Sequence, residues 1–332
     1  MTNLPFQDEY EAWRAHNADR LPEMDEEQLL RMEGATGIIP LFLNALLTPE
    51  ETGDDGKADE SKTTFDAAYE RLLQHPLIQD IPVQLAMFTT LLDKRFADLH
   101  FEHLSACVLE MRKSSPNPVC YDHRYLYFGA DNKMHCVNNF VRGCVTDLLH
   151  KHKSSMMLEP SWLNSCSNCK NPSVKGFLAE NIVIAYIRNN GLVVDELLKP
   201  DEFLIFAKGT EAAIVDKKSG TCILYIPDIF NYKAIDLLLR RVPTNKQNNV
   251  VIAPVHVTLQ APAQHKKSIA QFFEGHKKWI GGATKVAWHF VWITRKAGDP
   301  KLHEADVANG IPAYTEHRLT FAKVCPPLEF LK

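Results

Sequence analysis

The sequence predicts an α/β fold, in which a mixed sheet flanked by helices follows an N-terminal, mainly helical domain. Three observations carry this prediction. Helical patterns dominate before residue 160, several short apolar strands follow between 203 and 258, and a helix then precedes an aromatic-rich strand at 285–294. With 332 residues, 45% of them hydrophobic, the chain is long enough for two domains of roughly 150 residues, each with a packed core.

The N-terminal part is expected to be helical and to be interrupted by one polar segment. Asp25 can cap a helix that starts at Glu26. Residues 49–62 are acidic and nearly devoid of apolar side chains, which is typical of a solvated linker. Further helices are predicted at 64–73, 82–111 and 140–151, with strand-like stretches at 122–128 and 134–137.

The C-terminal part begins after a stretch rich in Ser, Asn and Pro at 152–172, which we interpret as a loop at the domain boundary. Ser173 can cap a helix that runs through Asn189, and Gly191 closes it. Strands are predicted at 203–207, 212–216, 222–226, 234–240, 250–258 and 285–294, with a helix at 264–280 and one short strand in the tail, 311–328. The predicted domains are 1–48, 63–160 and 165–330, with 49–62 as the linker.

Composition limits the classes of function. The formal net charge of −4 argues against a globally basic nucleic-acid binder, so a nucleic-acid surface would be a local patch. We find no charged segment followed by an apolar run at the start, and no stretch near the ~18–20 apolar residues of a membrane helix. We therefore expect no signal peptide and no membrane partner. The eight cysteines are then expected to be reduced thiols of a nuclear or cytosolic protein.

A carboxylate inside an apolar strand is the strongest chemical signal. Asp236 is surrounded by apolar residues, and burying its charge costs several kcal/mol unless it is paired, protonated or bound to a metal. The next buried strand ends in His256 and Thr258, and Glu180 lies beside the apolar stripe of the helix at 173–189. Hard oxygen ligands of this kind suit a Mg²⁺ site for phosphodiester hydrolysis. The alternatives are an exposed Glu180, an Asp236 at a solvated edge and a His256 that is simply a core residue.

Several segments resemble the C-terminal nuclease-type domain of Crinkler proteins and of the related retrotransposon hot spot proteins. The resemblance covers about 165–295 and implies a restriction-endonuclease-like (PD-(D/E)XK) mixed sheet flanked by helices. It implies that Glu180 is the helix carboxylate and Asp236 the main metal ligand. The segments that carry it are 171–180, Leu224-Tyr225-Ile226-Pro227, Ala234-Ile235-Asp236 and Val255-His256-Val257-Thr258.

The chain departs from the family pattern at the next strand. The family has Gln or Glu there and then Thr or Lys, where this chain has His256 and Thr258. The resemblance implies Mg²⁺ as the cofactor. Because imidazole suits Mn²⁺ or Zn²⁺ better than Mg²⁺, Mn²⁺ is the other candidate. Lys266 or Lys267 would replace the missing lysine; the alternative is a solvated basic helix end. Cys166-x2-Cys169 with Cys136 and Cys144 is a weak pattern for structural Zn²⁺, and we expect free thiols there.

The resemblance extends to the N-terminal region. Residues 36–43 resemble the helical lid of the family's ATPase, and Asp122-His123-Arg124-Tyr125 resembles the linking region of fungal members. The chain has no Gly-x4-Gly-Lys-[Ser/Thr] motif, because Gly53-Asp54-Asp55-Gly56-Lys57-Ala58 has the wrong spacing and no hydroxyl after the lysine. We therefore expect no ATP hydrolysis by this chain, and a remnant lid in 1–48.

Two functions follow from the resemblance. In the first, the chain is an effector with a metal-dependent endonuclease domain that acts on DNA in preference to RNA. In the second, the same fold is inactive and binds host nuclear DNA or proteins. The family implies residence in the host nucleus after secretion without a recognisable signal peptide, with the cytoplasm as the alternative, and a separate ATPase-bearing family member as a partner.

Overall fold

In the computed structural model, the chain forms two compact units, 1–149 and 150–332. The described residues are 7–18, 21–22, 24–25, 28–29, 32, 43, 65–114, 116–206, 220–227, 235–244, 249–260 and 266–331. The acidic segment 49–62, which includes residues 53–58, and all of the lid-like segment 36–43 except Leu43 lie outside them.

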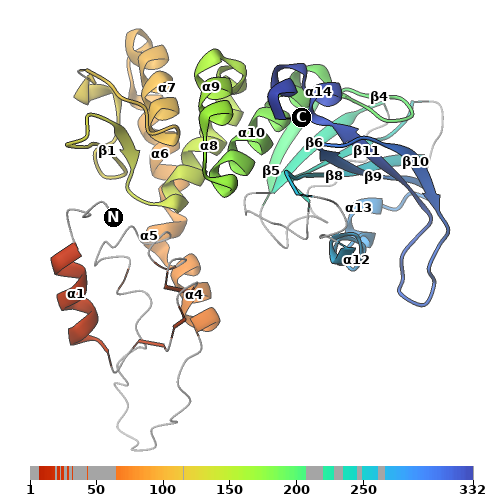
Figure 1. Cartoon of the computed structure of the whole chain (residues 1–332), viewed down its shortest axis with the longest axis horizontal. Coiled ribbons are helices and arrows are strands. Elements are labelled where there is room, and N and C mark those ends of the chain that lie inside the picture. The colour runs from red at the N-terminus through yellow and green to blue at the C-terminus, as the bar shows by residue number, and fades with distance from the viewer. Residues whose placement is uncertain are drawn as a thin grey trace, which may run out of the picture. The chain divides into compact units, whose positions relative to one another are not determined.

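The first unit is mainly helical and contains one small hairpin, as the sequence predicts (Figure 1). The hairpin pairs Leu126 with Cys136 in an antiparallel register. Asp25 acts as a cap, since its Oδ1 accepts a hydrogen bond from the backbone N of Gln28 at 2.8 Å. The elements are α1 (Gln7–His16), α4 (Phe65–Gln74), α5 (Pro76–Gln79), α6 (Ile81–Leu91), α7 (Lys94–Val108), η2 (Pro118–Cys120), β1 (Leu126–Phe128), β2 (Met134–Cys136) and α8 (Asn139–Lys153), whose end belongs to the second unit.

The stretch 152–172 is not the predicted loop. It contains the 3₁₀ helix η3 (Ser154–Leu158) and the helix α9 (Pro160–Asn168). Pro160 opens α9 at a position that needs no backbone N–H, and the helix buries Trp162 and Cys166. Because many residues of this helix are Ser or Asn, its short apolar face gives no clear helical periodicity in the sequence.

The helix predicted at 173–189 is confirmed as α10 (Pro172–Asn190), although its cap differs. Asn171, not Ser173, is the N-cap, because its Oδ1 accepts hydrogen bonds from the backbone N of Ser173 at 3.0 Å and of Val174 at 3.4 Å. The helix ends at Gly191, whose φ of +83° favours glycine.

The second unit is built on a seven-stranded mixed sheet in the order β10-β11-β9-β8-β7-β6-β5, with helices beside it (Figure 1). The strands β6, β7 and β8 form an antiparallel meander, and β9 pairs parallel to β8. The predicted α/β class is confirmed: helices form the N-terminal part of the chain, and a mixed sheet flanked by helices follows in the sequence. The strands are β5 (Glu202–Phe206), β6 (Cys222–Pro227), β7 (Leu237–Arg241), β8 (Asn249–Val257), β9 (Lys285–Thr294), β10 (Gly298–His303) and β11 (Tyr314–Thr320).

Some elements differ from the prediction. The helix expected at 264–280 is two helices, α12 (Lys266–Phe273) and α13 (Lys277–Ile280), because the chain turns at Gly275. The strand expected at 234–240 begins only at Leu237. The strand expected at 212–216 lies outside the described residues. The sequence did not predict β10 or the small hairpin of β3 (Leu192–Val193) and β4 (Leu197–Leu198); the unit ends with α14 (Phe321–Val324) and η6 (Pro326–Leu331).

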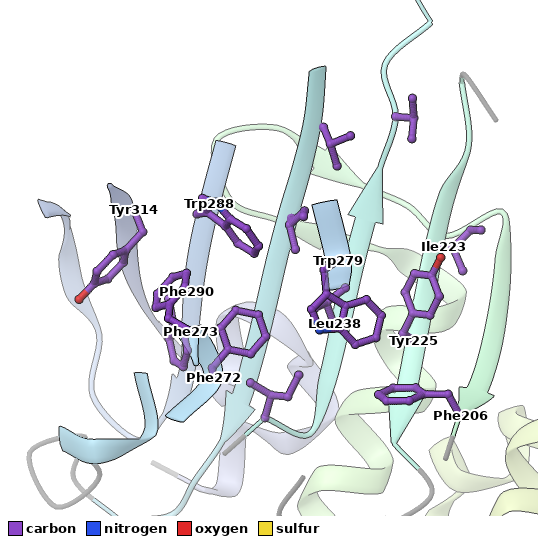
Figure 2. Packing of buried hydrophobic residues seen from close by; sticks show 14 of the residues in the cluster. Phe206, Ile223, Tyr225, Leu238, Phe272, Phe273, Trp279, Trp288, Phe290 and Tyr314 are labelled. Atoms are coloured by element: carbon purple, nitrogen blue, oxygen red, sulfur yellow. The ribbon is translucent and has the colours of Figure 1, made fainter. Parts of the chain in front are cut away.

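An aromatic core covers the sheet face that α12 and α13 pack on (Figure 2). Phe272 and Phe273 of α12 meet Trp288 edge-on, with ring centroids 6.0 and 5.5 Å apart. Trp279 of α13 contacts Tyr225 in the same manner. The buried Arg240 of β7 donates a hydrogen bond from Nε to the carbonyl oxygen of Trp279 at 2.9 Å, which fixes α13 against the sheet.

The strand β10 forms one edge of the sheet and is mostly exposed. Its antiparallel pairing with β11 shifts register between Gly298 and Lys301. Among the helices in the described ranges, none combines the length and apolar character that a bilayer span requires.

Candidate functional site

Asp236 lies at a bend directly before β7, and its carboxylate is buried. Its backbone N donates to the carbonyl oxygen of Val255 at 2.9 Å, so the pairing with β8 continues past the end of the strand. Its Oδ2 accepts a hydrogen bond from the backbone N of Val257 at 2.6 Å. The carboxylate therefore has a strong charge-favouring donor from the chain itself.

His256 of β8 lies directly beside this carboxylate. The register Leu237 opposite Val255 places residues 236 and 256 opposite each other, and Nδ1 of His256 is 3.3 Å from Oδ2 of Asp236. The imidazole is buried and meets the Trp292 ring edge-on, with centroids 5.2 Å apart. The structure thus brings together the two residues that the sequence pairs most directly.

Glu180 projects from α10 and is half-buried. Burial raises the pKa of its carboxyl well above the usual range, and the negative charge of Asp236 raises this pKa further. The two carboxylates therefore interact although they come from a helix and from the start of a strand. Two like charges in poorly hydrated surroundings favour a shared proton or a bound cation.

Thr258 takes part less directly. It follows β8, and its backbone N donates to the carbonyl oxygen of Ile293 at 2.9 Å. Its Oγ1 accepts a hydrogen bond from the backbone N of Gln260 at 3.1 Å, which shapes the turn after the strand. The side chains of Lys266 and Lys267, at the start of α12, lie outside the described part of the structure.

The three predicted metal ligands are not arranged as a closed coordination group. Within the described ranges, the ligand atoms of Glu180, Asp236 and His256 do not all lie within 4.8 Å of one another. Mg²⁺ and related hard ions retain several waters and need only one or two carboxylates in direct contact. The donor set therefore fits a hydrated ion between Glu180 and Asp236 better than an ion held by all three residues.

The cysteines of the zinc pattern have other partners. A hydrogen bond with Cys136 is the largest cause that raises the pKa of the Cys107 thiol, and burial raises this pKa further. The Cys166 thiol donates to the carbonyl oxygen of Lys175 at 3.8 Å, and burial raises its pKa to about 11. Across the described residues, Cys136, Cys144, Cys166 and Cys169 do not form a metal-ligand group.

A group that the sequence did not predict lies elsewhere in the second unit. Asp195, His289 and His317 bring one ligand atom each within 4.8 Å of the others. A signal for it exists in the sequence, because His289 alternates with Trp288 and Phe290 and so faces away from the aromatic core. The partners His317 and Asp195 could not be assigned without the pairing of β9 with β11 and the position of the β3–β4 turn.

Comparison of the chain with family models, with curated proteins and with solved structures found no match. The Crinkler resemblance, the lid-like segment and the implied nuclear setting therefore stay predictions. What the structure itself defines is a mixed α/β unit with a buried Asp236, a half-buried Glu180 and an imidazole beside Asp236.

Proposed function

We propose that the second unit is a metal-dependent nuclease domain that hydrolyses phosphodiester bonds in DNA. The observation that carries the proposal is the interaction of Glu180 with Asp236, two carboxylates from different elements in surroundings that raise the pKa of Glu180. Structural carboxylates are usually paired with a cationic side chain when buried. An acidic pair with an imidazole beside it is instead a typical composition for a catalytic metal site.

Glu180 and Asp236 would hold the ion in this proposal. A bound divalent ion supplies a positive charge that activates water and offsets the charge developing on the phosphate. The imidazole of His256, adjacent to Asp236, would accept or hold a proton close to the reacting phosphate. Because carboxylate oxygens and water would hold the ion, we expect both Mg²⁺ and Mn²⁺ to support activity.

A specific observation favours a second candidate, an inactive nucleic-acid or protein-binding module. Oδ2 of Asp236 already accepts a hydrogen bond from Val257, and this contact alone gives the carboxylate a structural role. The strand that follows also has His256 and Thr258 where the resemblance implies a stronger ligand and a lysine. In this case the domain would bind DNA or a host nuclear protein without cleaving a phosphodiester bond.

The two candidates differ in one assay. The purified chain is incubated with supercoiled plasmid and Mg²⁺ or Mn²⁺, beside Asp236→Asn, Glu180→Gln and a matched control, Asp201→Asn. Asp201 is exposed and accepts a hydrogen bond from the backbone N of Cys222, at the end of β6 away from Asp236, so D201N tests the loss of a carboxylate outside the site. We expect D236N and E180Q to lower the cleavage rate at least about 100-fold, as loss of a key electrostatic group does, and D201N to retain it.

Equal cleavage by the D236N, D201N and unaltered chains would show that the observed cleavage does not depend on Asp236. Absence of cleavage by all three, together with a plasmid mobility shift, would support the inactive DNA-binding module. RNA of the same sequence, tested in parallel, decides between the two nucleic acids.

A further inference from the structure

We propose that Asp195, His289 and His317 form a second, separate binding site for one divalent transition-metal ion, with Zn²⁺ as the preferred ion. The three residues come from the turn between β3 and β4, from β9 and from β11. This proposal does not depend on the nuclease assignment, because none of its residues belongs to the Glu180–Asp236 group.

The ligand atoms are already close to the spacing that zinc requires. Nδ1 of His289 is 3.0 Å from Nε2 of His317 and 3.6 Å from Oδ2 of Asp195. Zn²⁺ bonds of about 2.0–2.1 Å in a tetrahedral arrangement place neighbouring ligand atoms about 3.3 Å apart. The two observed distances lie on either side of that value, so small side-chain shifts would admit an ion.

The sheet holds the two imidazoles in place. The parallel strands β9 and β11 are in register, with His289 opposite Thr315 and His317 opposite Val291. The two rings lie 5.2 Å apart with an angle of 37° between their planes. Both histidines are buried.

The third ligand gives the site an opening to water. The Asp195 side chain is 64% exposed, whereas that of His289 is only 10% exposed. Glu196, which forms an ion pair with Arg241 at 2.8 Å, lies near His289, and Lys323 lies near His317. An ion can therefore enter from the side of the β3–β4 turn, and three protein ligands leave its fourth position for water.

The donor set selects the kind of ion. Two imidazole nitrogens and one carboxylate oxygen suit Zn²⁺, Co²⁺ and Ni²⁺, while Mg²⁺ and Ca²⁺ prefer oxygen alone. Without an ion, the two imidazoles can only share the hydrogen bond that their 3.0 Å separation implies. A bound ion would replace that proton and would tie the β3–β4 hairpin to two strands of the main sheet.

Metal binding is best measured in the full chain that carries Glu180→Gln and Asp236→Asn, so that the first site contributes no carboxylates. The chain is stripped with EDTA, dialysed, and titrated with Zn²⁺ against a chromogenic chelator and with Co²⁺ by visible absorption. We expect one Zn²⁺ per chain and the intense visible bands of four-coordinate Co²⁺. Adding Asp195→Asn should weaken Zn²⁺ binding more than about tenfold.

The matched control is His303→Gln. His303 lies on the neighbouring strand β10 and contacts Glu316 at 3.0 Å, so its replacement removes an imidazole from the same part of the sheet without touching the proposed ligands. This control should leave the affinity unchanged. Because Asp195 is exposed, D195N should keep the fold, which a circular dichroism spectrum checks. Failure of the parent chain to bind Zn²⁺, or equal affinity of the D195N and H303Q chains, would overturn the proposal.

Discussion

At the scale of single residues, Glu180 is the side chain of the candidate site whose environment most disfavours the charged form. Burial and the neighbouring Asp236 both raise the pKa of its carboxyl. A group whose pKa is higher in the folded state favours folding at low pH, and it loses that contribution as the pH rises through its folded pKa. At pH 7 an ionised Glu180 therefore opposes folding unless a cation is bound.

Glu180→Gln should accordingly stabilise the metal-free chain at pH 7, by on the order of 1 kcal/mol. Urea unfolding in EDTA measures this, with Glu202→Gln, at an exposed position of β5, as the control. Added Mn²⁺ should then stabilise the unaltered chain more than the E180Q variant. A destabilising effect of E180Q in EDTA would contradict this account of the site.

The residues of this site were predictable to different degrees. Spacing and apolar context sufficed to pair Asp236 with His256, because adjacent antiparallel strands bring such residues together. The same reasoning identified Glu180 only as a boundary position of a helix. The turn contact of Thr258 and the position of Asp195 depend on local loop geometry, which periodicity does not encode.

At the scale of elements, Gly191 joins α10 to the β3–β4 hairpin through a left-handed conformation. A Cβ atom at this position would lie 2.9 Å from the carbonyl oxygen of Leu198 and 2.9 Å from Cδ1 of Leu197. The hairpin thus packs directly on the backbone that ends the helix. This contact positions Asp195, which lies in the turn of the hairpin.

Gly191→Ala should destabilise the chain by about 1–3 kcal/mol, since it combines a strained φ with a close backbone contact. Gly176→Ala is the control within the same helix, because nothing lies within 4 Å of a Cβ there. It should stabilise the chain by about 0.5–1 kcal/mol through its higher helix propensity. Thermal unfolding of both variants tests the difference in sign, and equal effects would show that the Gly191 conformation carries no strain.

The elements that the sequence predicted well are those with strong periodicity, such as α10, β6, β8 and β9. Those it missed are short or polar. The helix α9 presents few apolar residues, β10 is almost wholly exposed, and the turn at Gly275 divides a helix whose apolar pattern continues past it. Such elements exist because of their tertiary contacts and not because of local propensity.

At the scale of the whole molecule, buried histidines contribute to the response to acid. Burial lowers the pKa of His100 and His103 in the first unit and of His150, His289 and His317 in the second. The clearest case is His150, whose pKa falls to about 4 and whose Nε2 lies 2.8 Å from Oδ1 of Asn181. A lowered pKa means that the unfolded chain takes up the proton at a higher pH than the folded chain does.

The sign of the effect follows from the lowered pKa. The contribution of His150 to stability is complete above pH 6.5 and is lost as the pH falls toward 4, because the unfolded state binds more protons in this window. For His150 the shift from 6.5 to about 4 corresponds to on the order of 3 kcal/mol. His150→Gln, which keeps a hydrogen-bonding group, should remove this part of the dependence.

Unfolding of the H150Q and unaltered chains in urea at pH 7.5, 6, 5 and 4 measures the difference. We expect the variant to lose less stability than the unaltered chain on acidification. Parallel curves for the two chains across the series would mean that His150 is not held neutral by burial.

The fold class follows from the sequence, whereas the order of strands in the sheet does not. A helix between β8 and β9 implies a parallel crossover connection, and the structure has one. The parallel pairing of β5 with β6, and the placement of β10 beyond β11, arise from connections whose sequence carries no comparable signal. Asp236 and His256 of the candidate site lie directly before β7 and on β8, two central strands of the sheet, whereas Glu180 lies on α10.

The edge strand β10 has a consequence for behaviour at high concentration. Pro300 offers no backbone N–H, Lys301 would have to bury its charge, and the shift between Gly298 and Lys301 breaks the regular row of donors and acceptors. A strand from another molecule would find a poor template along this margin. The chain is thereby guarded against edge-to-edge aggregation on the side of the sheet where its outermost strand meets water.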